Sequence, residues 1–405
     1  MPHLRPRHLA HLILQMKNHS PVIGVLGHRQ VGKTTLLEQL TKDYFSLDNK
    51  KELIEAREDP DGYVERRSQG WVALDECQNV PDLFPALKER IRLQKGRPGQ
   101  FLMSGSVRFT GNPHIRESLT GRITNLELLP LSIAEIEQIE ESNAFMYLLE
   151  ANSFHKEGMS RALMIEKKLH RSKERALDLF LEQGGLPGIC FIRDAKVRSL
   201  RIQSSLETIL DRDLRQIVRT TLPYQTVLSL VKTLARNMEF PLDILNLSRE
   251  TDMSRLTAKK LVYALENVFM LRLVKLEGAR TGFGYYFEDI AEANYLNENT
   301  LNSHTRLGQA LWMNIRAALS YRAGYLHEFF QFYSRSGRID FCVRTSHSIL
   351  GVVCIQNEYP SRKELGVVDS FLKHYKSSKV CMVHKDAKLT VISDRIAIVP
   401  VTSLI

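Results

Sequence analysis

The chain has 405 residues, of which 43% are hydrophobic and 25% are charged, and its formal net charge is +10. This length predicts two or three domains with buried cores, and the composition is that of an ordinary soluble globular protein. The positive charge favours a polyanionic partner such as nucleic acid, although charge alone does not distinguish such a protein from one with a merely basic surface.

The cysteines and the apolar runs exclude several other classes of protein. The five cysteines are scattered and without CxxC spacing, so neither a disulfide framework nor a zinc site is indicated. No run is long enough to span a bilayer, and Leu12–Leu14, the longest apolar run of residues 1–20, is too short for a signal-peptide core. We therefore expect a cytoplasmic protein without a membrane segment.

A loop with two glycines is the first functional motif along the chain. It follows the apolar run Pro21–Leu26, which predicts a buried strand, and it precedes Leu36–Leu40, which predicts the start of a helix. This is the context of a phosphate-binding P-loop, in which glycines let backbone N–H groups face a polyphosphate anion. The motif comprises Gly27, His28, Arg29, Gln30, Val31, Gly32, Lys33, Thr34 and Thr35.

Two side chains of this loop have expected roles in nucleotide binding. Lys33 would reach the β- and γ-phosphates, and the Thr34 hydroxyl would bind Mg²⁺. The alternative is a glycine-rich turn that binds no nucleotide.

A second motif follows in the run Trp71–Glu76, after a strand expected at Tyr44–Asp48 and a turn expected at Asp59–Gly62. An apolar run that ends in acids predicts a strand buried on both faces, with its functional residues at the carboxyl end. Asp75 would belong to the Mg²⁺ shell, and Glu76 would orient and deprotonate the attacking water. Alone, the acids would be interpreted as solvated groups at a strand end; their position after the P-loop favours the catalytic interpretation.

The next strand also ends in a polar residue. Residues 82–95 show helical spacing, and Gln100–Met103 predicts another buried strand that ends at Ser104. We expect Ser104 to contact the γ-phosphate or the lytic water; a plain turn is the alternative.

An arginine precedes the following strand, which is expected at Ile123–Leu129. Arg122 would compensate transition-state charge, either within its own subunit or as an arginine finger to a neighbouring one. A surface-paired arginine at a helix end is an equally good interpretation. Ser132 and Glu135 then predict a capping box at the start of a helix.

The segments GHRQVGKTT, VALDECQNVPDL, FLMSGS, SLTGRI and LLPLSIAEI resemble, in order and spacing, a prokaryotic family of AAA+-superfamily ATPases. The family pattern is similar to "GPRQVGKTT … LDEIQ.VP.L … LTGS … L.GR … L.PLS..E". The resemblance implies an α/β P-loop NTPase fold with a parallel sheet, ATP and Mg²⁺ as cofactors, and the usual roles for Lys33, Thr34, Asp75 and Glu76, with Arg122 at the family's Gly-Arg position. His28 replaces the family's proline, which should alter the stiffness of the loop more than its phosphate binding.

The middle of the chain, about 150–220, is helical and basic. The run Lys167–Arg175 is either a nucleic-acid face or a solvated helix face, and Gly184–Gly188 breaks the helices. Ser205–Leu214 resembles the family's "YL..YLERDL" segment and is expected to pack as a helical lid behind the nucleotide, without a chemical role.

Residues 225–290 predict a winged helix. Helices are expected at Leu228–Arg236, Leu242–Leu247 and Ser254–Asn267, and a hairpin at Met270–Val274 and Tyr285–Phe287. The third helix would place polar side chains in a major groove of DNA; they are Ser254, Arg255, Thr257, Lys259 and Lys260. The alternative is a contact between domains or subunits.

From about residue 300 the chain resembles the nuclease-like domain that ends this ATPase family, whose fold is similar to the PD-(D/E)xK group. There a helix Glu, a strand Asp and an ExK strand converge on a metal. In this sequence Asp340 is retained, Cys354 and Gln356 stand where Glu and Lys are needed, and Trp312 stands at the helix position. Because one carboxylate does not hold a hard metal, we expect an inactive nuclease fold; Glu358 substitutes only after a register shift.

These expectations combine into a domain plan and three hypotheses. The plan is an ATPase domain over 1–150, a helical lid or linker over 151–222, a winged-helix-like region over 223–298 and a nuclease-like domain over 299–405. The main hypothesis is ATP hydrolysis coupled to a conformational change on DNA or another macromolecule. The second is a nucleotide-dependent switch with slow hydrolysis and a protein partner, and the third is an active nuclease. Arg122 acting on a neighbour would imply a homo-oligomer.

Overall fold

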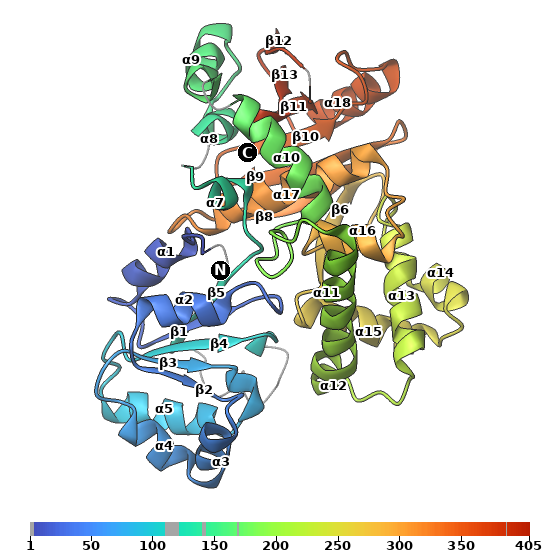
Figure 1. Cartoon of the computed structure of the whole chain (residues 1–405). Coiled ribbons are helices and arrows are strands. Elements are labelled where there is room, and N and C mark those ends of the chain that lie inside the picture. Colours follow the sequence, from blue (N-terminus) through green and yellow to red (C-terminus); the bar gives the residue numbers. More distant parts are fainter. Residues whose placement is uncertain (1–3, 110–120, 140–142, 168–169, 386) are drawn as a thin grey trace. The chain divides into compact units, whose positions relative to one another are not determined.

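The computed structural model describes residues 4–109, 121–139, 143–167, 170–385 and 387–405 (Figure 1). The chain divides into two compact units, and it passes between them several times. The first unit comprises Met1–Leu131, Leu186–Leu228 and Leu256–Leu271, and the second comprises Ser132–Gly185, Ser229–Arg255 and Arg272–Ile405.

The first unit is built on a five-stranded parallel sheet with the strand order β2-β3-β4-β1-β5. Its strands are β1 (Val22–Leu26), β2 (Tyr44–Ser46), β3 (Val72–Asp75), β4 (Phe101–Gly105) and β5 (Ile123–Glu127). Every residue of β1, β3 and β4 is buried, as their continuous apolar sequences predict for central strands of a parallel sheet.

Helices complete the first unit. They are α1 (Leu9–Met16), α2 (Lys33–Leu40), α3 (Lys50–Glu58), α4 (Pro60–Arg66), the short η1 (Cys77–Asn79), α5 (Leu83–Leu93), α11 (Ala195–Thr208), η3 (Ile209–Asp213), α12 (Leu214–Ile217) and α15 (Arg255–Asn267). The turn expected at Asp59–Gly62 is instead the start of α4. Asp59 accepts a hydrogen bond from Gly62 N, and Pro60 takes the first helical position, where its missing N–H has no cost.

The second unit contains a mixed eight-stranded sheet with the order β12-β13-β11-β10-β9-β8-β6-β7. Its strands are β6 (Leu271–Gly278), β7 (Phe283–Phe287), β8 (His327–Tyr333), β9 (Arg338–Thr345), β10 (Ile349–Cys354), β11 (Ser378–His384), β12 (Thr390–Ser393) and β13 (Ile396–Pro400). Its helices are α7 (Ile133–Glu137), α8 (Asn143–Glu150), α9 (Lys156–Lys167), α10 (His170–Gln183), α13 (Tyr224–Arg236), α14 (Ile244–Glu250), α16 (Ile290–Leu296), α17 (Ser303–Ser320), α18 (Arg362–His374) and η4 (Val401–Ser403).

The hairpin expected for a winged helix is part of this larger sheet. Helices α13, α14 and α15 and the strands β6 and β7 follow one another in the expected order. However, β6 also pairs in parallel with β8, with Lys275 opposite Phe330. Residue 299, where a domain boundary was expected, therefore lies between two strands of one sheet, β7 and β8. The winged helix stays a prediction.

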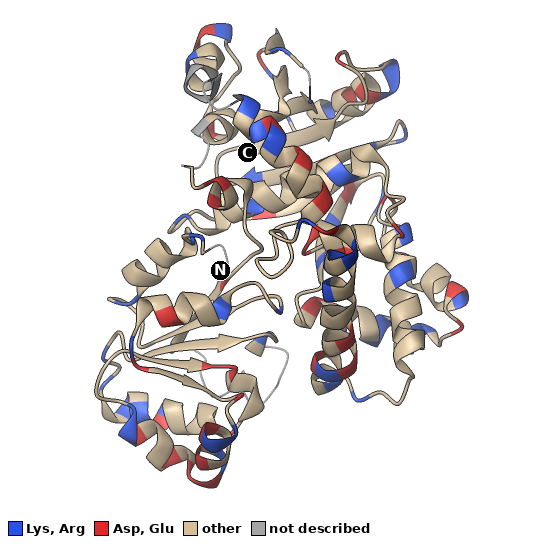
Figure 2. Ribbon diagram, in the orientation of Figure 1, with Lys and Arg blue, Asp and Glu red and all other residues tan. Residues whose placement is uncertain are grey.

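Charged residues gather on the helices, whereas the strands of both sheets are largely uncharged (Figure 2). The expected capping box is confirmed: Ser132 Oγ accepts from Glu135 N, and the Glu135 carboxylate accepts from Ser132 N. In the basic run Lys167–Arg175, residues 168–169 lie outside the described residues. Within α10, Lys173 is buried and its Nζ donates to Thr402 O, whereas Arg171 and Arg175 are exposed, so Lys173 alone is excluded from a solvated or nucleic-acid-binding face. Among the described helices, none is long and apolar enough to cross a membrane.

Candidate nucleotide site

The glycine-containing loop lies between β1 and α2, at the carboxyl end of the sheet. Strand β1 has β4 on one side and β5 on the other, so the loop stands where the strand order reverses, the usual ligand site of such sheets. Gly32 has φ 96° directly before α2, a conformation that favours glycine. A Cβ on Gly27 would lie 2.3 Å from Leu128 O, so no larger residue fits there.

Lys33 extends across the inside of this loop. Its Nζ donates to Gly27 O and to His28 O, both at 3.0 Å, and the residue is only 5% exposed. Burial lowers the pKa of Lys33, against the opposing effect of the carboxylates of Glu76 and Asp75. Burial removes the Lys33 ammonium from water, which disfavours its positive charge. A phosphate bound beside it would supply the opposite charge, so the loop favours an anion.

The Asp75 carboxylate is the centre of a hydrogen-bond cluster at the end of β3. It accepts from Thr34 Oγ1 at 2.6 Å, from the Tyr44 hydroxyl at 2.6 Å and from the Ser104 hydroxyl. Burial, together with the hydrogen bond to Asp75, raises the pKa of Tyr44, so this phenol remains a donor at neutral pH. The cluster draws its members from α2, β2, β3 and β4.

The same cluster provides the donor set for a metal. The Asp75 carboxylate and the Thr34 hydroxyl are hard oxygen ligands, and Thr34 is exposed at the surface of the loop. Mg²⁺ in nucleotide sites is bound by one or two protein oxygens together with phosphate oxygens. The residues present therefore fit Mg²⁺.

Glu76 follows Asp75 in a left-handed conformation, with φ 57°. This backbone turn separates its side chain from that of Asp75. The Glu76 carboxylate accepts from Ser106 Oγ at 3.2 Å and from Gln78 Nε2, and Gln78 Nε2 also donates to Ser106 Oγ at 3.1 Å. The half-buried carboxylate is thus fixed in orientation directly after Asp75 in the chain.

Ser104 lies within β4, opposite Val25 of β1. Its hydroxyl donates to Asp75 and accepts from Glu76 N at 3.2 Å. The plain turn considered for this position is therefore replaced by a strand residue that joins both acids, and contact with a phosphate or with water stays an expectation.

Arg122 lies at the other end of the sheet. The parallel register pairs Val22 with Ile123, so Arg122 lies beside the start of β1, whereas the loop follows the end of that strand. Five residues of strand span about 16 Å. The structure does not bring Arg122 to the loop of its own chain, which leaves a role toward a neighbouring subunit or a surface role. The residues 110–120 that precede it lie outside the described part of the chain.

Two residues fix the loop: Arg7, which no sequence motif predicted, and His28, which belongs to the motif itself. Arg7 Nη1 donates to Val31 O at 2.7 Å, and its Nη2 donates to Leu129 O at 2.5 Å. The His28 side chain is buried, with Nδ1 2.6 Å from Arg29 O. Arg7 had no motif to identify it, because an isolated arginine before a short helix has many possible roles.

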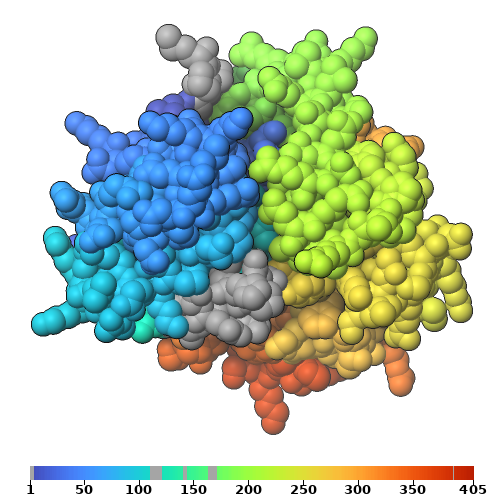
Figure 3. Space-filling model, turned by 90° about the horizontal axis from the view of Figure 1, so that it is seen from below, coloured from blue at the N-terminus to red at the C-terminus, as the bar shows by residue number. Residues whose placement is uncertain are grey.

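The segment 186–228 covers the loop from outside. Arg29 Nη1 lies 3.2 Å from Asp213 Oδ2, and Gln30 packs against Gly188. Burial raises the pKa of Asp213, against the opposing effects of Arg29 and Arg212. Figure 3 shows this segment, in yellow-green, directly against the blue surface of the first sixty residues. The segment that resembled "YL..YLERDL" therefore does contact the loop, through Asp213.

In the second unit, Asp340 on β9 lies near the start of α17. His304 Nε2 donates to Asp340 Oδ1 at 3.1 Å, and Cys354 N donates to Asp340 Oδ2 at 2.8 Å. Trp312, which stands at the helix position of the nuclease-like pattern, is fully buried and stacks on Tyr286 with ring centroids 4.4 Å apart. His304, two helical turns before Trp312 on α17, is the residue whose side chain hydrogen-bonds with Asp340, and the inactive nuclease fold stays a prediction.

Comparison with known proteins gives matches for two parts of the chain. Residues 19–137 match the family model of an AAA domain, AAA_14, and residues 174–281 match a domain of unknown function, DUF8612. Uncharacterized proteins of Mycobacterium bovis and Mycobacterium tuberculosis are each 26% identical over 257 residues, which is 62% of this chain and 49% of the relative. The chain thus spans about half the length of the curated relatives it matches.

Three solved structures show a weaker similarity. The Walker-type ATPase of Pyrococcus abyssi is 13% identical with a TM-score of 0.41, covering 72% of this chain and 98% of that one. The Thermotoga maritima RuvB Holliday junction branch migration motor is 14% identical, with a TM-score of 0.26 and coverages of 70% and 92%. The Aeropyrum pernix ORC1 protein in complex with DNA is 15% identical, with a TM-score of 0.28 and coverages of 74% and 94%.

These low TM-scores leave the family model and the sheet as the basis of the assignment. The predicted fold class is confirmed: an α/β P-loop NTPase fold with a parallel sheet, followed by a further α/β region.

Proposed function

We propose that this chain, whose residues 19–137 form an AAA-type P-loop ATPase domain, binds ATP with Mg²⁺ and hydrolyses it. The observation that carries the proposal is the convergence of Lys33, Thr34, Asp75 and Glu76 at the carboxyl end of one parallel sheet. Each of these residue types has a distinct part in phosphoryl transfer.

The loop and Lys33 would bind the triphosphate. The backbone N–H groups before α2 and the helix N-terminus attract phosphate oxygens, and the buried ammonium adds a full positive charge. Thr34 and Asp75 would hold Mg²⁺, which neutralises charge on the phosphates when it is bound. Glu76, fixed by Ser106 and Gln78, would orient a water molecule and accept its proton.

The contact of the loop with segment 186–228 supports coupling to a conformational change. Arg29 belongs to the phosphate-binding loop, and its ion pair with Asp213 joins that loop to η3. A change in the loop on hydrolysis would therefore act on this segment directly. The net charge of +10 and the exposed Lys259 and Lys260 on α15 favour DNA as the macromolecule. The second candidate remains a slow nucleotide switch with a protein partner.

The first experiment tests the catalytic base. Glu76→Gln should bind ATP as the wild type does and should lose steady-state turnover, because the amide accepts no proton at neutral pH. Glu38→Gln is the matched control, since Glu38 is exposed on the adjacent helix α2. Full turnover in Glu76→Gln would refute the assigned role.

A second experiment separates the two candidates. ATP turnover is measured with and without duplex or branched DNA: stimulation supports coupling to DNA, and an unchanged rate supports a switch for a protein partner. The solution mass with and without ATP gives the oligomeric state.

A third experiment tests Arg122. If Arg122 serves a neighbouring subunit, mixing the inactive Glu76→Gln and Arg122→Ala variants should restore part of the turnover, because some interfaces then combine an intact base with an intact arginine. No recovery, with Arg122→Ala fully active alone, would remove Arg122 from the site.

A further inference from the structure

Two neighbouring hollows in the second unit share part of their lining. Their volumes are about 650 Å³ and about 640 Å³, and both are lined by Phe240, Pro241 and Arg280. The first lies among α13, α14 and the turn between β6 and β7, and the second lies over β9, β10 and the start of α18. We call the two hollows together the Phe240 groove.

Cations without carboxylate partners line this groove. Arg255 and Arg280 line the first hollow, and Arg280, Arg335 and Lys363 line the second. All four side chains are exposed, and within the described residues none forms an ion pair. Arg280 lies over the Tyr333 ring, 5.5 Å from its centroid.

The acids of the groove are, in contrast, already engaged. Asp243 caps α14 through Leu245 N and Asn246 N, and Glu364 accepts from Ser361 in a capping box. Glu239 accepts from Asn302 and from Thr305, and Asp340 is paired with His304. Together the two linings hold five arginine or lysine side chains against four carboxylates, and the carboxylates already accept hydrogen bonds, so the groove suits phosphate groups.

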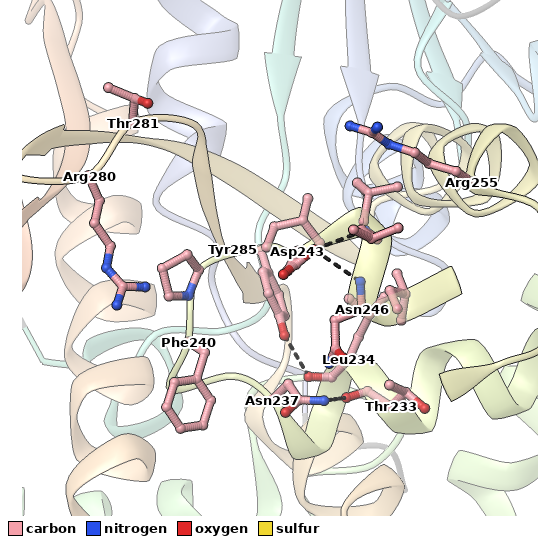
Figure 4. Close-up of a pocket in the computed structure, with 15 residues that line it drawn as sticks. Thr233, Leu234, Asn237, Phe240, Asp243, Asn246, Arg255, Arg280, Thr281 and Tyr285 are labelled. Atoms are coloured by element: carbon pink, nitrogen blue, oxygen red, sulfur yellow. Dashed lines mark hydrogen bonds between the residues drawn. The ribbon is translucent and has the colours of Figure 1, made fainter. Parts of the chain in front are cut away.

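An exposed aromatic ring stands between the two hollows. Phe240 is 61% exposed, although it lines both of them. Figure 4 shows Phe240 and Arg280 on one side of the first hollow, with the guanidinium directed toward the ring, and Arg255 on the opposite side. An aromatic face between cations is the arrangement that accepts an unpaired base between two phosphates.

We propose that the Phe240 groove binds single-stranded nucleic acid, with backbone phosphates on Arg255, Arg280, Arg335 and Lys363 and one base stacked on Phe240. A duplex hides the faces of its bases, so the exposed ring favours a single strand. The groove includes Arg255, the first residue of α15, the helix considered for duplex DNA, but its other cations come from other segments of the chain. The proposal deepens the macromolecule-binding part of the proposed function and is independent of ATP turnover.

The test measures binding of a fluorescein-labelled oligothymidylate to the full chain without ATP, by anisotropy over a salt series. The triple variant Arg280→Ala, Arg335→Ala, Lys363→Ala should weaken binding more than tenfold. It should also lower the slope of log K against log salt by about 2, since each phosphate contact on a single strand contributes about 0.7.

The control variant removes the same charge outside the groove. Lys51→Ala, Lys88→Ala, Lys376→Ala changes three exposed lysines that line neither hollow, so its salt slope should stay near that of the wild type. An equal loss in both triple variants would show non-specific attraction and overturn the proposal.

Phe240 provides a second, uncharged probe. Phe240→Ala should weaken binding of the oligonucleotide about tenfold, and Phe240→Tyr should retain it, because tyrosine also stacks. Tighter binding of a duplex of the same length, or equal binding of polyglutamate, would also refute the proposal. Because ATP is absent, these outcomes do not depend on the Glu76→Gln result.

Discussion

Asp75 and Asp340 are both buried aspartates on central strands, 2% and 7% exposed, yet their neighbours differ. The carboxylate of Asp75 accepts hydrogen bonds from three neutral hydroxyl groups. The carboxylate of Asp340 lies beside His304 and Arg338, with Arg338 Nε 3.7 Å away. Hydroxyl groups orient a carboxylate without cancelling its charge, whereas cations cancel it.

The difference shows why the same residue type has different chemistry in the two units. Burial tends to raise the pKa of Asp340, but His304 and Arg338 hold that pKa below its usual value. The negative charge of Asp340 is thus already balanced by protein groups, while that of Asp75 is available to a divalent cation.

The largest expected effect tests the role of each carboxylate in catalysis. Asp75→Asn should lower ATP turnover about 100- to 1,000-fold, because it removes a charge that acts on the transition state. Asp340→Asn should leave turnover unchanged. Steady-state hydrolysis at saturating Mg²⁺ gives both values, and equal losses in the two variants would contradict the comparison.

The next effect concerns stability, where Asp340→Asn should have the larger effect of the two variants. Asp340→Asn should destabilise the second unit by about 2 kcal/mol, because it leaves His304 and Arg338 without their carboxylate. The partial exposure of both cations keeps this cost below that of a fully buried pair. Asp75→Asn should cost less, since the amide oxygen still accepts from hydroxyl groups. Urea unfolding of the two variants measures the difference, and a greater loss in Asp75→Asn would reverse it.

A third buried aspartate sharpens the comparison. Asp213 has a raised pKa, caused first by burial, although Arg29 is adjacent. Asp213→Asn should therefore cost little stability, but it should change the KM for ATP about fivefold, because a partly exposed ion pair of about 1 kcal/mol is lost from the loop. The KM for ATP is measured for Asp213→Asn and for the control Asp211→Asn, since the Asp211 carboxylate is exposed on the same element. Equal KM changes in both would show that contact with the loop is unimportant.

The smallest expected effect depends on pH. Asp340 raises the pKa of His304 against the opposing effects of burial and Arg338, and Glu364 on α18 also raises it. Because the folded-state pKa exceeds the unfolded value of about 6.5, this stabilisation is complete below that pH and is lost as pH rises through the folded-state pKa. Melting temperatures across this range should fall more for the wild type than for His304→Gln. Parallel curves would exclude the pair as the cause.

Much of the fold and the centre of the site were predictable because their signals are local. Continuous apolar runs identified β1, β3 and β4, and the glycines with Lys33 identified the loop. The position of Asp75 at a strand end also follows from neighbouring residues. Such features depend on distances along the chain, which the sequence states directly.

Other parts required the order and register of strands. Tyr44 reaches Asp75 because β2 pairs with β3, and Arg122 is remote from the loop because of its register with β1. His304 contacts Asp340, and Trp312 stacks on Tyr286, because of how α17 packs on its sheet. Residue spacing alone does not state which strands become neighbours.

The sequence by itself thus determined the P-loop, its lysine and threonine, and the two acids of β3, since each is a pattern within one strand–loop–helix or one strand. The tertiary structure alone decided which groups surround each carboxylate: hydroxyls at Asp75, cations at Asp340 and the loop arginine at Asp213. Those neighbours come from distant segments. Their chemistry depends on burial and charge at short range, which exist only after the chain has folded.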